Sequence, residues 1–449
     1  MNTQKNAWTA LVSLAALAAH ATVPEVADVA MAQDAARLVT ITYTLSDAPA
    51  VVTVDIQTNA ADGAWASIGG ANVQQMSGDV WRRVEPGARM VLWRPDLSWP
   101  DHKVADGGAR AVVTAWALDN TPDYMVVDLS AAALPGTQRY YPAADFLPGG
   151  LLGNDDHRTT SLVLRKILAK GVEWTMGSTP LETQRDAARE ATHKVTLANN
   201  YYVGVFPVTQ AQWDLVQPAR PVPSWFNNAV ARAMRPVESV SYNEIRNAAN
   251  ATADPAYEWP NDPSPGSFLG LLRAKTGLDF DLPSEAQWEF AARAGNGDTK
   301  WGDGSGILNK AADANLDRLG RYERNGGKVL KDGGGYADPP RDCGAANGTA
   351  PVGSYAPNAW GLHDTAGNVW EWCLDWFEED ISAHGGVVNA DPANPAITLS
   401  GAPGASRVRR GGSWYSAAGN CRPASRGGNA PVSRTNGIGL RVLCFAGLR

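Results

Sequence analysis

The segment from Arg407 to Arg441, RVRRGGSWYSAAGNCRPASRGGNAPVSRTNGIGLR, most constrains how this chain can fold. It is rich in Arg, Gly, Asn and Ser, and its few apolar residues follow neither a helical nor a strand period. Such a segment cannot build a core of its own, so a rigid scaffold must hold it. Polar residues on a loop held in this way indicate function more strongly than residues in a core. We therefore expect the rest of the chain to support this segment.

Length and composition set the class of that scaffold. A chain of 449 residues suggests two or three domains with well-buried cores. The 17 Trp, 45 Gly and 29 Pro indicate a loop-rich fold pinned by aromatic side chains rather than by long helices. The formal net charge of −7 argues against nucleic-acid binding, which needs a concentrated basic face.

The N-terminus has the pattern of an export signal. Lys5 is followed by an apolar run from Ala7 to Ala19, and Ala19-His20-Ala21 matches an A-x-A cleavage site. We expect a signal peptide over residues 1–21, with a second possible cut at residues 30–32; the alternative is a free, disordered or helical terminus. No later stretch reaches the 18 apolar residues of a membrane span. The expected location is therefore secreted or periplasmic.

Cysteine and histidine usage limits the covalent and metal chemistry. The four cysteines lie in the last quarter of the chain, at Cys343, Cys373, Cys421 and Cys444. In an exported protein they permit two disulfides, in any of three connectivities. There is no C-x-x-C, and the six His are dispersed, so neither a zinc ribbon nor a His-built metal site is expected.

Residues 36–130 have the pattern of an all-β domain. Alternating apolar residues at 38–43, 51–56 and 111–117 are separated by Gly-containing turns, which predicts a small immunoglobulin-like β-sandwich. Trp81, Trp93, Trp99 and Trp116 are expected in the core or at an edge, although an aromatic platform for carbohydrate stays open. Residues 131–157 are rich in Pro, Gly and Asp and are expected to be a linker.

The remainder, residues 158–449, combines short strands and capped helices and is expected to be an α+β domain. Residues 162–176 suggest a hairpin, and Thr209, Ser241 and Ser284 are predicted helix N-caps, with Gln287 completing a capping box. The long Gly-rich stretch at 301–358 requires something to hold it, such as disulfides or bound ions.

Four blocks in this region match one family. They are WTMGS at 174–178, LPSEAQWEFAAR at 282–293, GLHDTAGNVWEW at 361–372 and RRGGSW at 409–414. In this order the blocks resemble the formylglycine-generating enzyme family, also called sulfatase-modifying factor. The resemblance covers roughly residues 158–449 and implies a variant of the C-type lectin fold with little regular secondary structure, stabilised by calcium.

The resemblance also implies calcium ligands. One set is the side chains of Asp364 and Glu371 with the carbonyls of Gly367 and Val369, which are oxygen ligands suited to calcium. The alternative is that both carboxylates only support the turn. A second set would be Asn315 and the Leu316 carbonyl with a more distant aspartate, for which both Asp332 and Asp342 stay open.

The family's enzymes carry a C-x-x-x-x-C pair directly after Gly-Gly-Ser. That pair binds copper(I) and uses dioxygen to oxidise a cysteine in a C-x-P-x-R motif of a sulfatase to formylglycine. Here Ser416 stands at the first position and Cys421 at the second, so the pair is absent. Soft thiolates select copper(I), and a protonated hydroxyl does not replace one. The copper oxidase mechanism is therefore disfavoured, and copper is expected only in an active oxidase.

Three functions stay open. The first is a divergent oxidase using Cys421, Ser416 and Ser413, with Trp370 and Arg426 in the groove. The second is a binding module for a protein or glycan ligand, a sulfatase included, whose contact residues are Trp414, Tyr415, Asn420 and Asn429. The third is a structural role in which the seven Arg of the segment form internal salt bridges. Those are Arg407, Arg409, Arg410, Arg422, Arg426, Arg434 and Arg441.

A compositional bias sharpens the second hypothesis. Residues 415–437 contain no Met, Gln, Lys, Glu or Trp, the five residues that codons ending in a pyrimidine cannot encode. A loop diversified by a retroelement has this signature, and the alternative is chance in a short Arg/Gly/Asn/Ser-rich stretch. We favour binding over oxidation at this segment.

Overall fold

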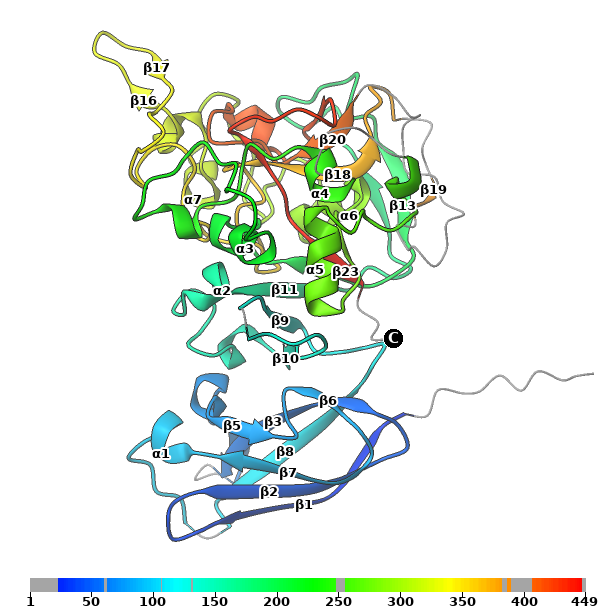
Figure 1. Ribbon diagram of the computed structural model, residues 1–449, viewed down its shortest axis with the longest axis vertical. Coiled ribbons are helices and arrows are strands. Elements are labelled where there is room, and N and C mark those ends of the chain that lie inside the picture. The colour runs from blue at the N-terminus through cyan, green and yellow to red at the C-terminus, as the bar shows by residue number, and fades with distance from the viewer. Residues whose placement is uncertain are drawn as a thin grey trace, which may run out of the picture.

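The computed structural model describes residues 23–59, 63–105, 107–130, 132–247, 255–381, 386–388 and 406–445. Two parts are stacked along the long axis of the molecule, a smaller part made of strands and a larger mixed part above it (Figure 1). The predicted signal peptide at 1–21 lies outside the described residues.

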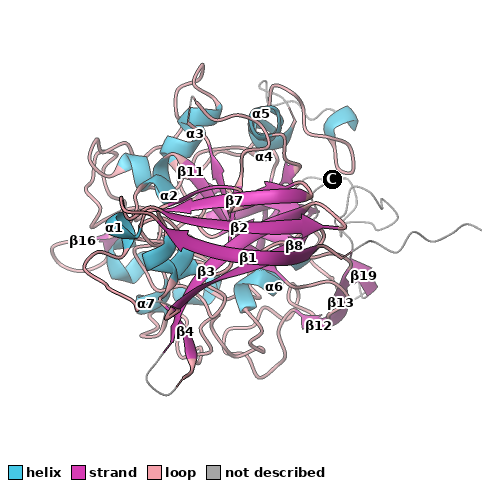
Figure 2. Cartoon of the chain, turned by 90° about the horizontal axis from the view of Figure 1, so that it is seen from below, coloured by secondary structure: helices cyan, strands magenta, loops and turns pink. Residues whose placement is uncertain are grey.

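The smaller part consists of two antiparallel sheets. Their orders are β1-β2-β7-β5 and β4-β3-β6, and β8 joins the second sheet by pairing with β3. Figure 2 looks onto β1, β2 and β7 from below. The elements are β1 (Glu25–Gln33), β2 (Val39–Ser46), β3 (Ala50–Asn59), β4 (Trp65–Ser67), η1 (Gly70–Val73), β5 (Met76–Gly78), β6 (Arg82–Val84), β7 (Gly87–Trp93), α1 (Pro95–Ser98) and β8 (Ala109–Ala117).

Alternation along the strands builds the core that these sheets share. In β2 every second residue is buried, from Val39 to Leu45, and β3 and β7 add Val52 and Val91 to the same cluster. The strands predicted at 38–43, 51–56 and 111–117 are confirmed within β2, β3 and β8. β1 begins before the predicted start at 36 and contains the second possible cleavage site, with Met31 opposite Ile41.

The larger part is built on a six-stranded sheet of order β10-β9-β11-β14-β23-β15. Its strands are β9 (Tyr124–Asp128), β10 (Arg139–Tyr141), β11 (Ser161–Ile167), β14 (Tyr201–Gly204), β15 (Phe280–Asp281) and β23 (Leu443–Phe445). The predicted boundary at 130 and linker at 131–157 do not match this arrangement, because β9 pairs with β11 and β10 extends the sheet beside β9. The larger part therefore begins near Tyr124.

Aromatic packing joins the two parts. Trp81, from the smaller part, stacks on Tyr141 at 5.4 Å between ring centroids and meets the edge of Phe146 at 5.9 Å. The backbone N–H of Tyr140 donates to the Trp81 carbonyl at 2.8 Å. A Cβ on Gly70 would lie 2.5 Å from the Phe146 ring, so only glycine allows this close approach. Trp81 thus lies in a core that both parts share.

Three further sheets and several short helices complete the larger part. The sheets contain β12 (Glu173–Met176), β13 (His193–Leu197) and β19 (Gly386–Val388); β16 (Val329–Leu330) and β17 (Tyr336–Ala337); and β18 (Trp370–Trp376), β20 (Arg407–Arg410), β21 (Arg426–Asn429) and β22 (Ile438–Gly439). The helices and turns are η2 (Ala144–Phe146), α2 (Asp156–Thr159), α3 (Gln210–Val216), η3 (Arg232–Met234), α4 (Tyr242–Arg246), η4 (Pro255–Tyr257), α5 (Phe268–Thr276), α6 (Glu285–Arg293), α7 (Leu316–Leu319), η5 (Glu323–Gly327) and η6 (Ala418–Cys421). The hairpin predicted at 162–176 is wrong, because β11 pairs with β9 and β14 whereas β12 pairs with β13. In the described part of the chain, no helix combines the length and apolar character needed to cross a bilayer.

The three predicted helix starts are confirmed. Thr209, Ser241 and Ser284 cap α3, α4 and α6, each in a reciprocal capping box. At α6 the Ser284 hydroxyl accepts from the Gln287 N–H at 3.2 Å, and the Gln287 side chain accepts from the Ser284 N–H at 2.9 Å. Local sequence alone determines these caps.

Buried polar side chains, rather than disulfides, hold the long stretch at 301–358. The fully buried Asp313 carboxylate accepts four backbone N–H groups, from residues 308, 309, 315 and 316, at 2.6–3.2 Å. All four cysteines are free thiols, so the predicted disulfides are absent from this structure. The four thiols do not pair because each cysteine packs into a different hydrophobic cluster.

Candidate functional site

The segment from Arg407 to Arg441 lies largely inside the domain. β20 is held between β18 and β21 in a four-stranded sheet. The side chain of Trp414 is 1% exposed, and its indole N–H donates to the Asn436 carbonyl at 2.8 Å. The prediction that Trp414 contacts a ligand is therefore wrong, because its ring packs edge-on against Phe226 and Tyr415.

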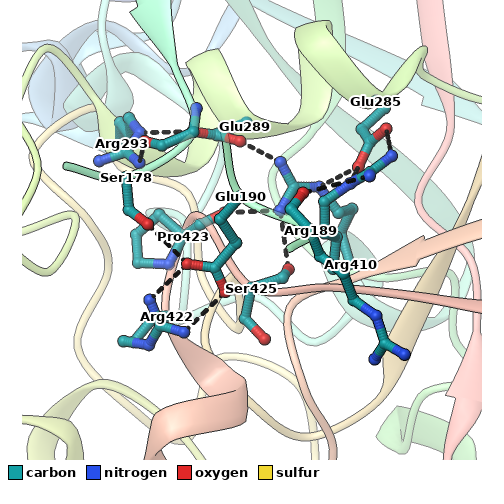
Figure 3. Close-up of polar contacts among 12 residues, drawn as sticks. Ser178, Arg189, Glu190, Glu285, Glu289, Arg293, Arg410, Arg422, Pro423 and Ser425 are labelled. Carbon is teal, nitrogen blue, oxygen red and sulfur yellow. Dashed lines mark hydrogen bonds and ion pairs between the residues drawn. The ribbon is translucent and has the colours of Figure 1, made fainter. Parts of the chain in front are cut away.

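Arginine–glutamate pairs anchor the segment to helix α6 (Figure 3). Arg426 forms a bidentate pair with Glu285 at 2.7 and 2.6 Å. Arg410 bridges two carboxylates one helical turn apart, with its Nε 3.1 Å from Glu285 and its Nη2 in contact with Glu289. Burial alone would raise the pKa of Glu285, but the Arg426 and Arg410 guanidinium groups outweigh it and hold that pKa below its usual value. The Glu285 carboxylate is thus kept charged inside the core.

A second group of pairs fixes the turn around η6. Arg422 contacts Glu182 and forms a bidentate pair with Glu190 at 2.9 and 2.7 Å. Ser178, in the first family block, donates to Glu190 at 2.6 Å (Figure 3). Burial raises the pKa of Glu182, and Arg422 only partly offsets this.

Six of the seven arginines predicted to form internal salt bridges do so. Their partners are Glu258 for Arg407, Glu285 and Glu289 for Arg410, Glu182 and Glu190 for Arg422, Glu285 for Arg426, Glu244 for Arg434 and Glu371 for Arg441. Within the described residues, Arg409 has no carboxylate in ion-pair distance.

The predicted catalytic trio is sealed from solvent. Cys421 is fully buried, and burial raises the pKa of its thiol to about 12. The Ser416 hydroxyl lies 3.0 Å from both the Ser413 N–H and the Ser413 hydroxyl, so it closes the turn after Gly412. Gly412 is required there, since a Cβ on it would lie 2.5 Å from the Cys421 sulfur. These residues stabilise a turn.

The residues present do not fit copper(I). The site offers one protonated thiol and a hydrogen-bonded hydroxyl, whereas copper(I) favours soft thiolate ligands. The other three cysteines belong to separate core clusters. Among the residues that the structure describes, no three His, Cys, Asp or Glu side chains form a group suited to a metal ion.

The predicted first calcium set does not assemble around Glu371. Both Glu371 oxygens accept from Arg441, at 2.8 and 2.9 Å, and one also accepts the Trp288 indole N–H at 2.6 Å. Asp364 instead accepts from the Gly353 N–H and the Asn368 amide, and burial raises the pKa of Asp364 to about 6. A cation bound to Glu371 would have to displace Arg441.

Two other members of that set, Gly367 and Val369, belong to the same turn. Gly367 has a φ of +88°, and its N–H donates to the Gly411 carbonyl at 2.6 Å. The turn therefore couples the third family block to the fourth.

The second predicted calcium set is likewise occupied by protein contacts. The Asn315 amide donates to the Gly306 carbonyl at 2.8 Å, and the Leu316 carbonyl accepts the Gly320 N–H at 3.0 Å. Asp332 lies at the tip of the β16–β17 hairpin, which projects from the body (Figure 1). Asp342 is exposed, and its carbonyl accepts from Asn228.

A cavity of about 290 Å³ lies beside β20 and β21. Arg409 stacks over the Trp370 ring at 4.4 Å from its centroid, and the Tyr415 side chain lies near its guanidinium. Burial lowers the pKa of Arg409, and its Nε has no hydrogen-bond partner in the described part of the chain. The lining residues are Arg189, Trp370, Phe377, Arg409, Asn420, Ser425, Arg426, Gly427 and Gly428.

Some of the predicted site residues line this cavity and others do not. Trp370, Arg426 and Asn420 line the cavity. Tyr415 does not line it but lies near Arg409, which does. Asn429 follows Gly428 at the end of β21 and is partly buried. Sequence reasoning placed Arg409 among the salt-bridge residues, because nothing in RVRR separates it from its neighbours.

The chain is similar in sequence to known formylglycine-generating enzymes. A formylglycine-generating enzyme of Streptomyces coelicolor is 38% identical over 165 residues, covering 36% of this chain and 45% of that protein. Its counterpart in Thermomonospora curvata is 36% identical over 168 residues, covering 36% of this chain and 48% of that protein. The chain thus spans about half the length of these curated relatives. Among solved structures, Treponema denticola variable protein 1 is similar with a TM-score of 0.45 and 26% identity, covering 64% of this chain and 96% of that one.

The family match is the broadest of these similarities. Residues 156–445, more than half of the chain, match the sulfatase-modifying factor enzyme 1-like domain. This range agrees with the region in which the four sequence blocks occur. The chain therefore belongs to the sulfatase-modifying factor enzyme 1-like family.

Proposed function

We propose that the larger part is a binding module that takes an anionic group of a protein or glycan ligand into the cavity beside Arg409. The observation that carries the proposal is the position of the Arg409 side chain. It is the arginine of the segment that lacks a carboxylate partner among the described residues, and it lines a cavity.

The energetics of burial support a ligand at this position. A guanidinium taken out of water is destabilised unless an anion compensates it. Stacking on Trp370 and the nearby Tyr415 side chain compensate the burial of Arg409 only in part, so its pKa stays below its ordinary value. A carboxylate entering the cavity would supply the missing charge through charge-assisted hydrogen bonds.

The other lining residues support recognition of an extended anionic group. Asn420 is exposed and offers both a donor and an acceptor. Gly427 and Gly428 carry no side chains and leave backbone accessible at the cavity wall. The rigid pair of Arg426 with Glu285 holds that wall in place before a ligand arrives.

We also propose that the protein is exported and acts in surface adhesion. The lectin-like character of the larger part and the immunoglobulin-like character of the smaller one would suit surface adhesion. The pattern at residues 1–21 supports export of such a module.

Equilibrium titration tests this function. Peptides with clustered Asp and Glu and sugars carrying uronic acids serve as two arms, with their amide and neutral-sugar counterparts as controls. At least one acidic arm should bind, and Arg409→Ala should weaken it at least tenfold. The proposal fails if both acidic arms bind no better than their neutral counterparts.

A second candidate is a divergent oxidase, which the named relatives support. It requires a reactive thiolate, whereas the Cys421 thiol is buried with a raised pKa. We expect the native protein to show no fast-reacting thiol toward a disulfide reagent at pH 8, and four only after unfolding. One fast thiol that is lost in Cys421→Ala, together with oxidation of a C-x-P-x-R peptide, would establish the oxidase instead.

A further inference from the structure

A second cavity, of about 430 Å³, opens at the end of helix α3 and shares no lining residue with the Arg409 cavity. It is formed by α3, by the loop that follows it, by η3 and by a distant residue, Arg341. The lining residues are Gln210, Asp214, Pro218, Ala219, Arg220, Pro221, Val222, Ser224, Asn227, Arg232 and Arg341.

This cavity carries an excess of positive charge in an acidic chain. Three arginines from three segments, Arg220, Arg232 and Arg341, line it against a single carboxylate, Asp214. Arg232 pairs with Asp214 at 3.2 Å, which leaves two guanidinium groups without a carboxylate in ion-pair distance among the described residues. The chain as a whole carries a net charge of −7, so a local positive excess lining a cavity indicates an anionic ligand.

The two remaining guanidinium groups are placed to receive a ligand. Arg341 lies over the Trp225 ring at 4.8 Å, and its Nε donates to the Trp225 carbonyl at 3.3 Å. The side chain of Arg220 makes no hydrogen bond or ion pair with any residue in the described ranges. Pro218 and Pro221 flank Arg220 and limit the backbone freedom of its loop.

Gln210 supplies an independent indication. Its side chain is 1% exposed, and its amide nitrogen donates to the Phe226 carbonyl at 2.8 Å. That bond fixes the orientation of the amide and leaves Oε1 as a buried acceptor without a donor among the described residues. Buried acceptors are normally satisfied, and because Gln210 lines the cavity, a rotation of its side chain would bring this one to a ligand hydroxyl.

We propose that this cavity binds a phosphate or sulfate monoester of a hydroxylated small molecule, such as a sugar. Arginine forks match the oxygens of a tetrahedral phosphate or sulfate group, and three arginines line this cavity. The Gln210 acceptor then takes a neighbouring hydroxyl of the same ligand. The cavity volume lies in the range of small-molecule sites, which run from roughly 300 to 1,000 Å³.

Calorimetric titration of the full chain tests the proposal. The probes are glucose 6-phosphate, glucose 6-sulfate, inorganic phosphate, inorganic sulfate, glucose and gluconate. We expect one or both esters to bind at least tenfold more tightly than glucose or gluconate, and less tightly as salt rises. A preference for the phosphate or the sulfate ester identifies which tetrahedral anion the cavity takes.

Three variants locate the binding. Arg220→Ala and Arg341→Ala should each weaken ester binding at least tenfold. Gln210→Leu should weaken the sugar esters while leaving the inorganic anions unchanged, a pattern that misfolding would not produce. Arg83→Ala, an exposed arginine of the smaller part paired with Glu85, is the matched control and should bind as the wild type does.

Two results would overturn the proposal. One is the absence of ester binding at millimolar concentration, and the other is ester binding that neither arginine variant weakens. Arg409→Ala should leave ester binding intact, so failure here is distinguishable from failure of the function proposed for the Arg409 cavity.

Discussion

Arg409 and Arg410 are adjacent in β20 and have opposite surroundings. Arg410 points into the core and bridges Glu285 and Glu289, whereas Arg409 points outward, stacks on Trp370 and lines a cavity. Successive side chains of a strand face opposite sides of the sheet, which is why one residue is structural and the next is available. The lesson is that the partner, rather than the residue type, decides what an arginine does in this fold.

The largest effect should come from breaking an inner pair. Arg422→Met would leave Glu182 and Glu190 buried without a guanidinium, which costs about 3–5 kcal/mol of unfolding free energy. Urea denaturation monitored by tryptophan fluorescence measures this loss. A loss no larger than that of Arg409→Met would show that inner and outer arginines do not differ in the way described.

Buried carboxylates with and without close arginine partners should differ in pH dependence. Burial raises the pKa of Glu238 from 4.5 to about 7, whereas Arg426 and Arg410 lower that of Glu285. Between pH 4.5 and 7 the folded protein keeps a proton on Glu238 that the unfolded chain has lost. Stability from this group therefore falls by about 3 kcal/mol as pH rises through that window.

Glu285 has the opposite sign, because its stabilisation is present above its unfolded pKa and is lost as pH falls through the folded value. Glu238→Gln should flatten the stability profile between pH 4.5 and 7. An unchanged slope in Glu238→Gln would assign that pH dependence to other groups.

A smaller effect is expected at the outer arginine. Arg409→Ala removes a stacking contact with Trp370 and should cost about 0.5–1 kcal/mol of stability. Thermal and urea unfolding compared with Arg422→Met measures the contrast. Unfolding of Arg409→Ala at room temperature would mean that Arg409 is itself a core residue.

Calcium should have the smallest effect. Because Arg441 and Trp288 occupy the Glu371 carboxylate, we expect the same melting temperature in calcium and in a chelator. Calcium present at 100 times its dissociation constant would add about 2.7 kcal/mol to the free energy of unfolding. A rise in melting temperature that corresponds to this stabilisation would support the calcium ligands implied by the family resemblance.

The sequence predicted what local or family-wide patterns determine. The capping box of Ser284 and Gln287 depends on residues three apart, and the family blocks marked the correct region. Pairing between strands distant in sequence could not be predicted from local patterns. For this reason β10 was assigned to a linker, and a hairpin was wrongly predicted at 162–176. The polar character of the C-terminal segment suggested exposure, but carboxylates distant in sequence bury it, and no local signal distinguishes Arg409 from Arg410.

The central claim is that this segment acts through Arg409 and that Cys421 is inert. It is tested most directly by the dissociation constant of the acidic probe that binds best, measured for the wild type, Arg409→Ala and Cys421→Ala. We predict at least tenfold weaker binding for Arg409→Ala, about 1.4 kcal/mol or more, and no change for Cys421→Ala. Unchanged binding in Arg409→Ala would contradict the claim, as would loss of binding in a folded Cys421→Ala protein.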